Sequence, residues 1–211
     1  MTEVEMPGPI TDILVDRNRS VTGLTVIAPD HARLLSTVAG ACAATGANIV
    51  DAQVFTTADG MALDTIFVSR AFRYDEDELR RAGSIVLAIE RALSGQVRLR
   101  DMVAARTRQA GEDRDVFRIH PEVSIDNTLS NRFTVVEVTG LDRPGLLYEL
   151  TAIMSRLSLN IASAHIATFG EKAADVFYVT DLTGEKITSA HRQEAIRRAI
   201  LGVFDLTGSG L

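Results

Sequence analysis

A short turn in the second half of the chain has residue types suited to binding a small charged ligand. It lies in the segment GLDRPGLLYEL, residues 140–150, between a strand-like and a helix-like apolar run. Asp142 can accept a hydrogen bond from a backbone N–H of the first helical turn, and Pro144 is tolerated there because its missing N–H would have no partner. Gly145 weakens a helix by about 0.8–1.0 kcal/mol relative to alanine, a cost that is offset if a ligand needs close access to the N–H groups at the positive helix end. The turn is therefore either a tight strand-to-helix connection or a backbone cradle for an anionic group.

A turn of related composition lies earlier in the chain, where Asp30 precedes Asp142 by 142 − 30 = 112 residues. Arg33 stands where Gly145 stands, so close backbone approach is obstructed, although a guanidinium can itself contact a carboxylate. His31 is interpreted either as a solvated first-turn residue or as a pH-dependent contact. The first turn is thus the weaker candidate for a ligand cradle.

An asparagine followed by isoleucine comes after both helix-like runs, as Asn48-Ile49 and as Asn160-Ile161. An amide side chain donates and accepts hydrogen bonds, which suits a zwitterionic ligand with an ammonium and a carboxylate. Asparagine is also common in turns for its own backbone chemistry. Both interpretations stay open at these positions.

These features belong to a repeat that runs through most of the chain. The same offset of 112 residues links Leu34 to Leu146, Leu35 to Leu147, Asn48 to Asn160, Ala52 to Ala164 and Thr56 to Thr168. Each copy has a strand pattern, a helix pattern, two strand patterns joined by a hairpin, and a second helix pattern. With a fourth strand this order is the ferredoxin-like βαββαβ unit. We predict an α+β fold of two such domains in tandem, with antiparallel sheets and helices on one face.

The pattern also predicts the limits of the domains. The fourth strand of the first copy is the uncertain element, and Pro121 favours an edge position for it. In the second copy, only Val203 to Leu206 remains for a short closing strand. The predicted segments are an N-terminal segment at 1–20, a first domain at 21–95, a linker at 96–114, a possible fourth strand of the first domain with its connection at 115–130, and a second domain at 131–208.

Composition excludes several classes of function. The net charge of −6 and the aromatic content of 5% argue against nucleic acid as a partner. They also argue against an RNA-binding module with the same order of strands and helices. No apolar run approaches the ~20 residues that span a bilayer, and the N-terminus lacks a signal-peptide pattern. The single cysteine, Cys42, excludes an internal disulfide framework. We expect a cytoplasmic protein without membrane contact.

No catalytic signature is present in the sequence. Phosphate-binding loops, nucleophile elbows and zinc-protease motifs are missing, and the four histidines have no metal-ligand spacing. We therefore expect no catalytic residues, no metal and no cofactor. One enzymatic alternative is a ferredoxin-like hydrolase of the acylphosphatase type, for which Arg143 is the candidate phosphate-binding residue.

The repeat resembles the ACT domain, a small amino-acid-sensing module, and in particular the tandem ACT pair at the C-terminus of bifunctional PII uridylyltransferase/uridylyl-removing enzymes. The resemblance covers most of residues 22–188. The second copy has the Asp-Arg-Pro-Gly turn and the later Asn-Ile of the ACT pattern, whereas the first departs from it at Ala32 and Arg33. The matching segments are TVIAPDHARLLSTVAGACAATGANIVDAQVFTTADGMALDTIFVSR, PEVSIDNTLSNRFTVVEVTGLDRPGLLYEL and NIASAHIATFGEKAADVFYVTDLTGEKI.

The resemblance implies a regulatory module that senses an amino acid, most of all glutamine, as a signal of nitrogen status. It implies catalytic domains and PII proteins as partners, although this chain has neither nucleotidyltransferase nor HD motifs. It also implies pairing of the two modules, or of two chains, through their second strands, with ligands bound at that junction. Each turn would then face the Asn-Ile of the other copy. The alternative is a free-standing double-ACT regulator or dimerisation module. The implied ligand-binding residues are Asp30, His31, Arg33, Asn48, Ile49, Leu141, Asp142, Arg143, Pro144, Gly145, Leu146, Asn160 and Ile161.

Overall fold

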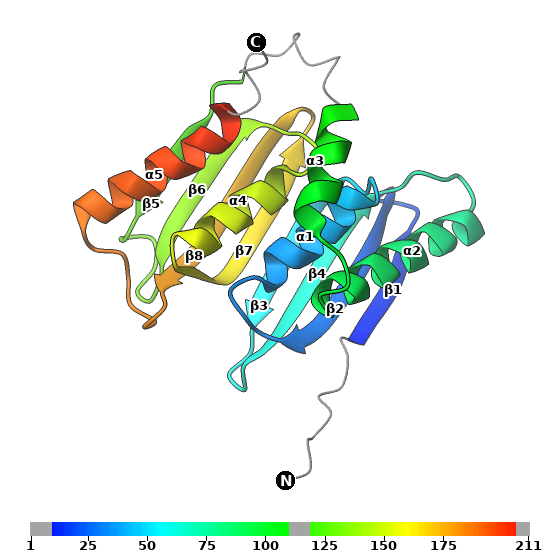
Figure 1. The fold of residues 1–211 in the computed structure, drawn as a ribbon, viewed down its shortest axis with the longest axis horizontal. Coiled ribbons are helices and arrows are strands. Elements are labelled where there is room, and N and C mark those ends of the chain that lie inside the picture. The colour runs from blue at the N-terminus through cyan, green and yellow to red at the C-terminus, as the bar shows by residue number, and fades with distance from the viewer. Residues whose placement is uncertain (1–9, 110–118, 206–211) are drawn as a thin grey trace.

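In this computed structural model, the eight strands of the described residues form a single antiparallel sheet, and Figure 1 shows the helices on one face of it. The structure describes residues 10–109 and 119–205. Across the sheet the strand order is β1-β2-β4-β3-β7-β8-β6-β5. The strands are β1 (Ile10–Asp16), β2 (Val21–Pro29), β3 (Ile49–Thr56), β4 (Met61–Ser69), β5 (Glu122–Asp126), β6 (Thr134–Leu141), β7 (Leu159–Phe169) and β8 (Lys172–Asp181). The helices are α1 (Leu34–Ala44), α2 (Asp75–Leu93), α3 (Leu99–Gln109), α4 (Leu146–Arg156) and α5 (Ala190–Asp205).

The sheet consists of two similar halves that meet at β3 and β7. The first half holds β1 to β4 beneath α1 and α2, and the second holds β5 to β8 beneath α4 and α5 (Figure 1). The central strands pair antiparallel, with Asp51 opposite Ala167 and Phe55 opposite Ser163. The predicted α+β fold and the predicted pairing of the two second strands are therefore confirmed.

The edge strand of each half differs from the prediction. β1 lies in the segment treated as an N-terminal extension, and it pairs with β2 from Ile10↔Ile27 to Asp16↔Val21. β5 was expected to complete the first half, but it pairs with β6 in the second. Each half therefore has its edge strand before the repeat pattern instead of after it. Alternation of apolar residues shows which face of a strand is buried, but it does not show which strand is the partner.

Two helical regions, α3 and the end of α5, also differ from the prediction. The segment expected as a linker, 96–114, contains α3, which packs against α1. Gly40 of α1 allows α3 and α4 to approach, because a Cβ there would lie 3.0 Å from Leu99 of α3 and 2.8 Å from the Tyr148 ring of α4. Val203, expected to begin a closing strand, lies in α5. Residues 110–114 of the linker and 206–208 of the second domain lie outside the described residues.

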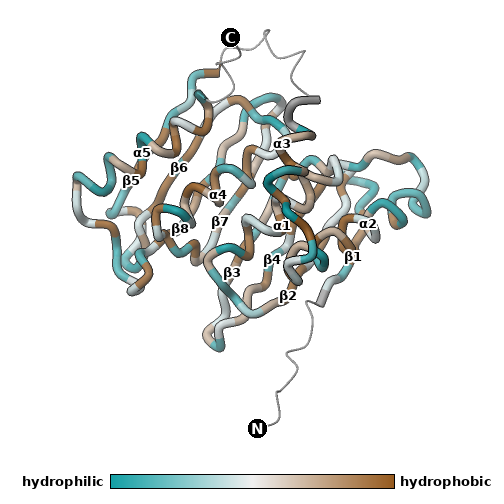
Figure 2. Tube along the Cα trace, viewed as in Figure 1, coloured by the Kyte–Doolittle hydropathy of each residue, from teal (hydrophilic) through white to brown (hydrophobic). Residues whose placement is uncertain are grey.

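The core fills the space between the sheet and the helices. Its largest fully buried side chains include Leu24 and Ile66 in the first half and Phe177 and Leu150 in the second. Along α2 and α5, hydrophobic and hydrophilic residues alternate because only one face of each helix is covered (Figure 2). Among the described residues, no helix combines the length and apolar content that crossing a membrane requires.

Candidate functional site

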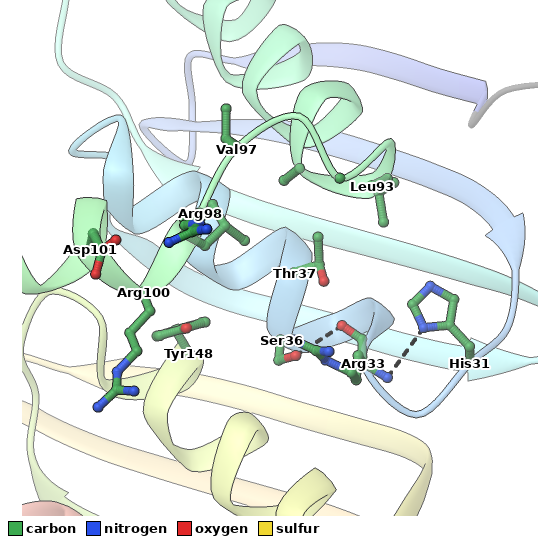
Figure 3. Close-up of a pocket in the computed structure, with 13 residues that line it drawn as sticks. His31, Arg33, Ser36, Thr37, Leu93, Val97, Arg98, Arg100, Asp101 and Tyr148 are labelled. Atoms are coloured by element: carbon green, nitrogen blue, oxygen red, sulfur yellow. Dashed lines mark hydrogen bonds between the residues drawn. The ribbon is translucent and has the colours of Figure 1, made fainter.

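One large cavity does not have the geometry of a ligand site. It has a volume of about 590 Å³ and lies between α1, the end of α2, the start of α3 and Tyr148. Arg33, Arg98 and Arg100 line it, which would favour an anion. However, Figure 3 shows Arg100 extending past Tyr148, away from Arg33 and Arg98, so the guanidinium groups do not converge on one point. Neither of the two asparagines expected at a ligand site lines this cavity.

A much smaller cavity lies where the two halves meet. Asp30 and His31 of the first turn line it together with Asn160 and Ile161, which begin the central strand of the other half. The side chain of Asp64 also lines it, from β4. The volume is about 10 Å³, close to that of a single water molecule. The structure thus brings the first turn and the second Asn-Ile pair together, as expected.

Asp30 and Asp142 make equivalent hydrogen bonds in the two halves. Oδ2 of Asp30 accepts a hydrogen bond from Thr56 at 2.8 Å, and Oδ2 of Asp142 accepts one from Thr168 at 3.2 Å. Both bonds connect a turn to the last residues of the central strand in the same half. Neither helix has a side-chain cap, so the expectation that Asp142 caps α4 is wrong. Its Oδ1 instead accepts the N–H of Arg143 at 2.8 Å.

The register of the central strands places the second turn beside the start of β3. Ala167, next to Thr168, lies opposite Asp51, and Thr168 contacts Asp142. Asn48 immediately precedes β3, is exposed, and accepts the N–H of Ser69 on its backbone carbonyl at 2.9 Å. The second turn and Asn48 therefore lie at the same edge of the junction, related to Asp30 and Asn160 by an approximate twofold axis.

Gly145 is required by the backbone conformation of its turn. It is the N-cap residue of α4 with φ of 85°, in the left-handed region, whereas Arg33 at the equivalent position has φ of −113°. Residues with a Cβ rarely adopt the left-handed region because the Cβ approaches a carbonyl oxygen. Space for a ligand is thus not the first reason for this glycine, and the two turns differ in backbone as well as in side chain.

We expect Gly145→Ala to destabilise the protein by about 1–2 kcal/mol, since alanine must adopt the left-handed conformation. Gly83→Ala is the matched control, because Gly83 lies inside α2 and a Cβ there would meet no atom within 4 Å. The control is expected to stabilise by about 0.4–1 kcal/mol. Urea unfolding measures both changes, and equal effects of the two substitutions would contradict this explanation.

Arg143 is buried and holds the second turn in place. Its side chain is only 4% exposed and contacts both oxygens of Glu149, at 3.0 and 2.6 Å. It also donates to the backbone carbonyl of Val203 at 3.0 Å, which ties the turn to α5. The guanidinium is therefore already occupied, and the hydrolase alternative loses its candidate phosphate-binding residue.

The remaining predicted residues surround the second turn or begin a central strand. Pro144 is exposed and Leu146 is buried at the start of α4. Leu141 ends β6 and is partly exposed, as is Ile49 at the start of β3. These side chains shape the edge of the junction without offering polar groups.

Two acidic residues at the site were not predicted. Asp64 is 1% exposed and Asp175 is 3% exposed. Burial, followed by the negative charge of Asp30, raises the pKa of Asp64 to about 7. Burial also raises the pKa of Asp175 to about 7, with a backbone hydrogen bond from Ala167 opposing it and the charge of Asp142 adding to it. The signal in the sequence was an acid at the same place in two apolar strands, which alternation assigns to the inward face.

The comparisons with known proteins agree with this duplicated arrangement. Residues 22–82 match the model of the ACT domain, and residues 129–205 match that of the ACR family N-terminal ACT domain. The chain is 60% identical over 186 residues to a "Bifunctional uridylyltransferase/uridylyl-removing enzyme" of Bradyrhizobium sp. (strain ORS 278), and 58% identical over 187 residues to one of Rhodopseudomonas palustris. These matches cover 88% of this chain but only 20% of each relative.

One solved structure aligns with low similarity. It is a crystal structure of an unknown protein from Galdieria sulphuraria, with a TM-score of 0.29 and 16% identity. The alignment covers 90% of this chain and 94% of the other. A TM-score this low adds nothing to the family matches.

Proposed function

Since the chain belongs to the ACT family, of which it carries two domains in tandem, we propose that it senses an amino acid and regulates a PII uridylyltransferase/uridylyl-removing enzyme. Glutamine is the proposed ligand, because a uridylyltransferase acting on PII proteins responds to nitrogen status in the family that the chain resembles. The chain spans about one fifth of the length of its relatives, 20%, so the catalytic domains of the enzyme are its proposed partners.

One observation carries the proposal. The cavity at the β3–β7 junction combines an acid of one half, Asp30, with an amide of the other, Asn160. A site assembled from both halves changes when the halves shift relative to one another. Ligand binding there would favour one placement of the halves over another, which is the requirement for a regulatory effect.

The charges of the site suit a zwitterion. The carboxylate of an amino acid would bind the backbone N–H groups at the start of α1 or α4, at the positive helix end. The ammonium group would bind Asp30 or Asp142, and the amide of Asn160 or Asn48 would fix the orientation of the ligand. An amino acid is far larger than a cavity of about 10 Å³, so the junction must widen to admit it.

Calorimetric titration of the chain with glutamine and other amino acids tests this function. We expect binding heat for the wild type and a loss of affinity of at least about 10-fold, or 1.4 kcal/mol, in Asp30→Asn/Asp142→Asn, because the charged hydrogen bond to the ammonium is removed. Asp12→Asn is the matched control, since Asp12 is an exposed acid on the edge strand β1. Absence of heat with every amino acid, in a folded sample, would refute the sensor function.

A further inference from the structure

Asp64 and Asp175 lie at corresponding positions of the two halves, on the inward faces of β4 and β8. Asp64 lies opposite Val26 of β2 and Val54 of β3, and Asp175 lies opposite Val138 of β6. Among the described residues, neither oxygen of Asp64 has a hydrogen-bond partner, and neither does Oδ1 of Asp175. Both halves therefore hold a buried polar group that the fold itself leaves unsatisfied.

Such an arrangement is rare, because buried polar groups in folded proteins are nearly always hydrogen-bonded. The neighbouring charges do not compensate for it. Asp30 and His31 are the titratable residues that border the cavity of Asp64, while α1, β3 and β7 contribute apolar or amide side chains there. The charged group that acts on Asp175 is Asp142, with Glu171 and Arg143 acting on Asp142 in turn. In each half, the charge of the turn acid, Asp30 or Asp142, thus adds to the effect of burial on the inward acid.

The position of Asp64 is decisive for its role. Asp64 lines the junction cavity together with Asp30 and Asn160, where the proposed ligand would enter, and both its carboxyl oxygens are buried without a partner in the described part of the chain. We propose that Asp64 and Asp175 form the floor of the two sites and receive the ammonium group of the ligand, together with Asp30 and Asp142. This inference rests on the proposed sensing function and assigns to the site its selectivity for ligands that carry an amine.

A proton must leave the site when the ammonium group enters. With a pKa of about 7, Asp64 and Asp175 are largely protonated below neutral pH. As the ammonium group binds, the carboxyl O–H bond breaks, the proton passes to solvent, and the carboxylate oxygen accepts a hydrogen bond from the ammonium N–H. The charge around the acid is conserved, because the ammonium group brings one positive charge while one proton leaves. Below pH 7, binding therefore releases up to one proton per occupied site, and well above pH 7 it releases almost none.

Calorimetry with L-glutamine in two buffers of different ionisation enthalpy measures this proton release. At about pH 6 we expect the apparent binding enthalpies in the two buffers to differ by the equivalent of up to one proton per site, and at about pH 8 to nearly coincide. In Asp64→Asn/Asp175→Asn the difference at pH 6 should vanish. Thermal unfolding of the same samples shows that the variant is folded.

Selectivity for ligands that carry an amino group provides a second test. The wild type should bind glutamine at least about 10-fold more tightly than 4-carbamoylbutanoate, which is glutamine without its amino group, and the double variant should discriminate less. Heat of binding without any buffer dependence at pH 6 would overturn the role of Asp64 and Asp175 while leaving the sensing function intact. Absence of heat with all amino acids would overturn both.

Discussion

Asp64→Asn/Asp175→Asn is expected to make the unliganded protein less sensitive to pH and more stable at pH 8. Each acid has a pKa of about 7 when folded, against 3.8 for the ordinary side chain, so the folded state binds more protons between these values. The contribution of these two acids to stability is therefore full below about pH 4, falls as the pH rises towards and through neutrality, and is lowest above it. A difference of about 3 pKa units corresponds to at most about 4 kcal/mol per residue.

The asparagine variants remove the ionisation but not the burial of a polar group. An unpaired amide costs about 1–3 kcal/mol, so the net gain at pH 8 should be about 1–3 kcal/mol per residue, which is smaller than the full effect of ionisation. Urea unfolding at pH 5, 6.5 and 8 measures the change, with Asp12→Asn as an exposed control. If the variants and the wild type lose stability in parallel between pH 5 and 8, the two acids are not held neutral by the fold.

The loss of stability on ionisation of Asp64 and Asp175 has a functional explanation. In a site that binds a cation, Asp64 and Asp175 keep carboxyl oxygens free of internal partners among the described residues, and the unliganded protein is less stable as a result. Ligand binding to the folded state then restores stability in proportion to its concentration over its dissociation constant. The duplicated acids connect the stability of each half to the occupancy of its site.

The periodicity and the repeat were sufficient to predict the central elements. Leu34 and Leu35 recur as Leu146 and Leu147, and all four are buried in the first turns of α1 and α4. The edge strands were assigned wrongly, although β1 and β5 each precede their partner across a short connection. A short connection makes antiparallel pairing with the next strand available, but apolar alternation alone is equally consistent with pairing elsewhere.

Side-chain roles at the site were harder to predict than its position. The opposed turns and Asn-Ile pairs follow from the pairing of β3 with β7. Burial of Arg143 depends on Glu149, one helical turn beyond the turn motif, and on α5, a distant contact that the motif does not reveal. The positive φ of Gly145 depends on the path of the backbone between β6 and α4. Asp64 was visible in the sequence as part of the repeat, but its meaning required knowing that the inward face of β4 reaches the junction.

Glu78 is a third buried acid, and its environment is the opposite of that of Asp64. It is 0% exposed and accepts hydrogen bonds from Thr22 at 3.0 Å, from the N–H groups of Ala71 and Phe72 at 3.1 and 3.0 Å, and from Arg81 at 2.7 Å. Burial alone would raise its pKa, but these hydrogen bonds outweigh burial and lower the pKa below the usual value. Glu78 thereby fastens α2 to β2 and to the connection that precedes the helix.

Glu78→Ala is therefore expected to destabilise the protein by about 3–5 kcal/mol, because it leaves a buried hydroxyl and two N–H groups without their acceptor and removes the ion-pair partner of Arg81. Glu76→Ala, at an exposed position of the same helix, should change stability by no more than about 0.5 kcal/mol. The dependence on pH has the reverse sign to that of Asp64: the contribution of Glu78 is present above the ordinary pKa of 4.5 and is lost as the pH falls. Urea unfolding between pH 3 and 7 distinguishes this pH dependence from that of Asp64, since Glu78→Ala should destabilise the protein least at the acid end. A penalty that does not shrink at acid pH would show that the charge of Glu78 contributes nothing to stability. A buried acid with four donors serves the fold, whereas Asp64 and Asp175, buried without enough donors, are placed for a ligand.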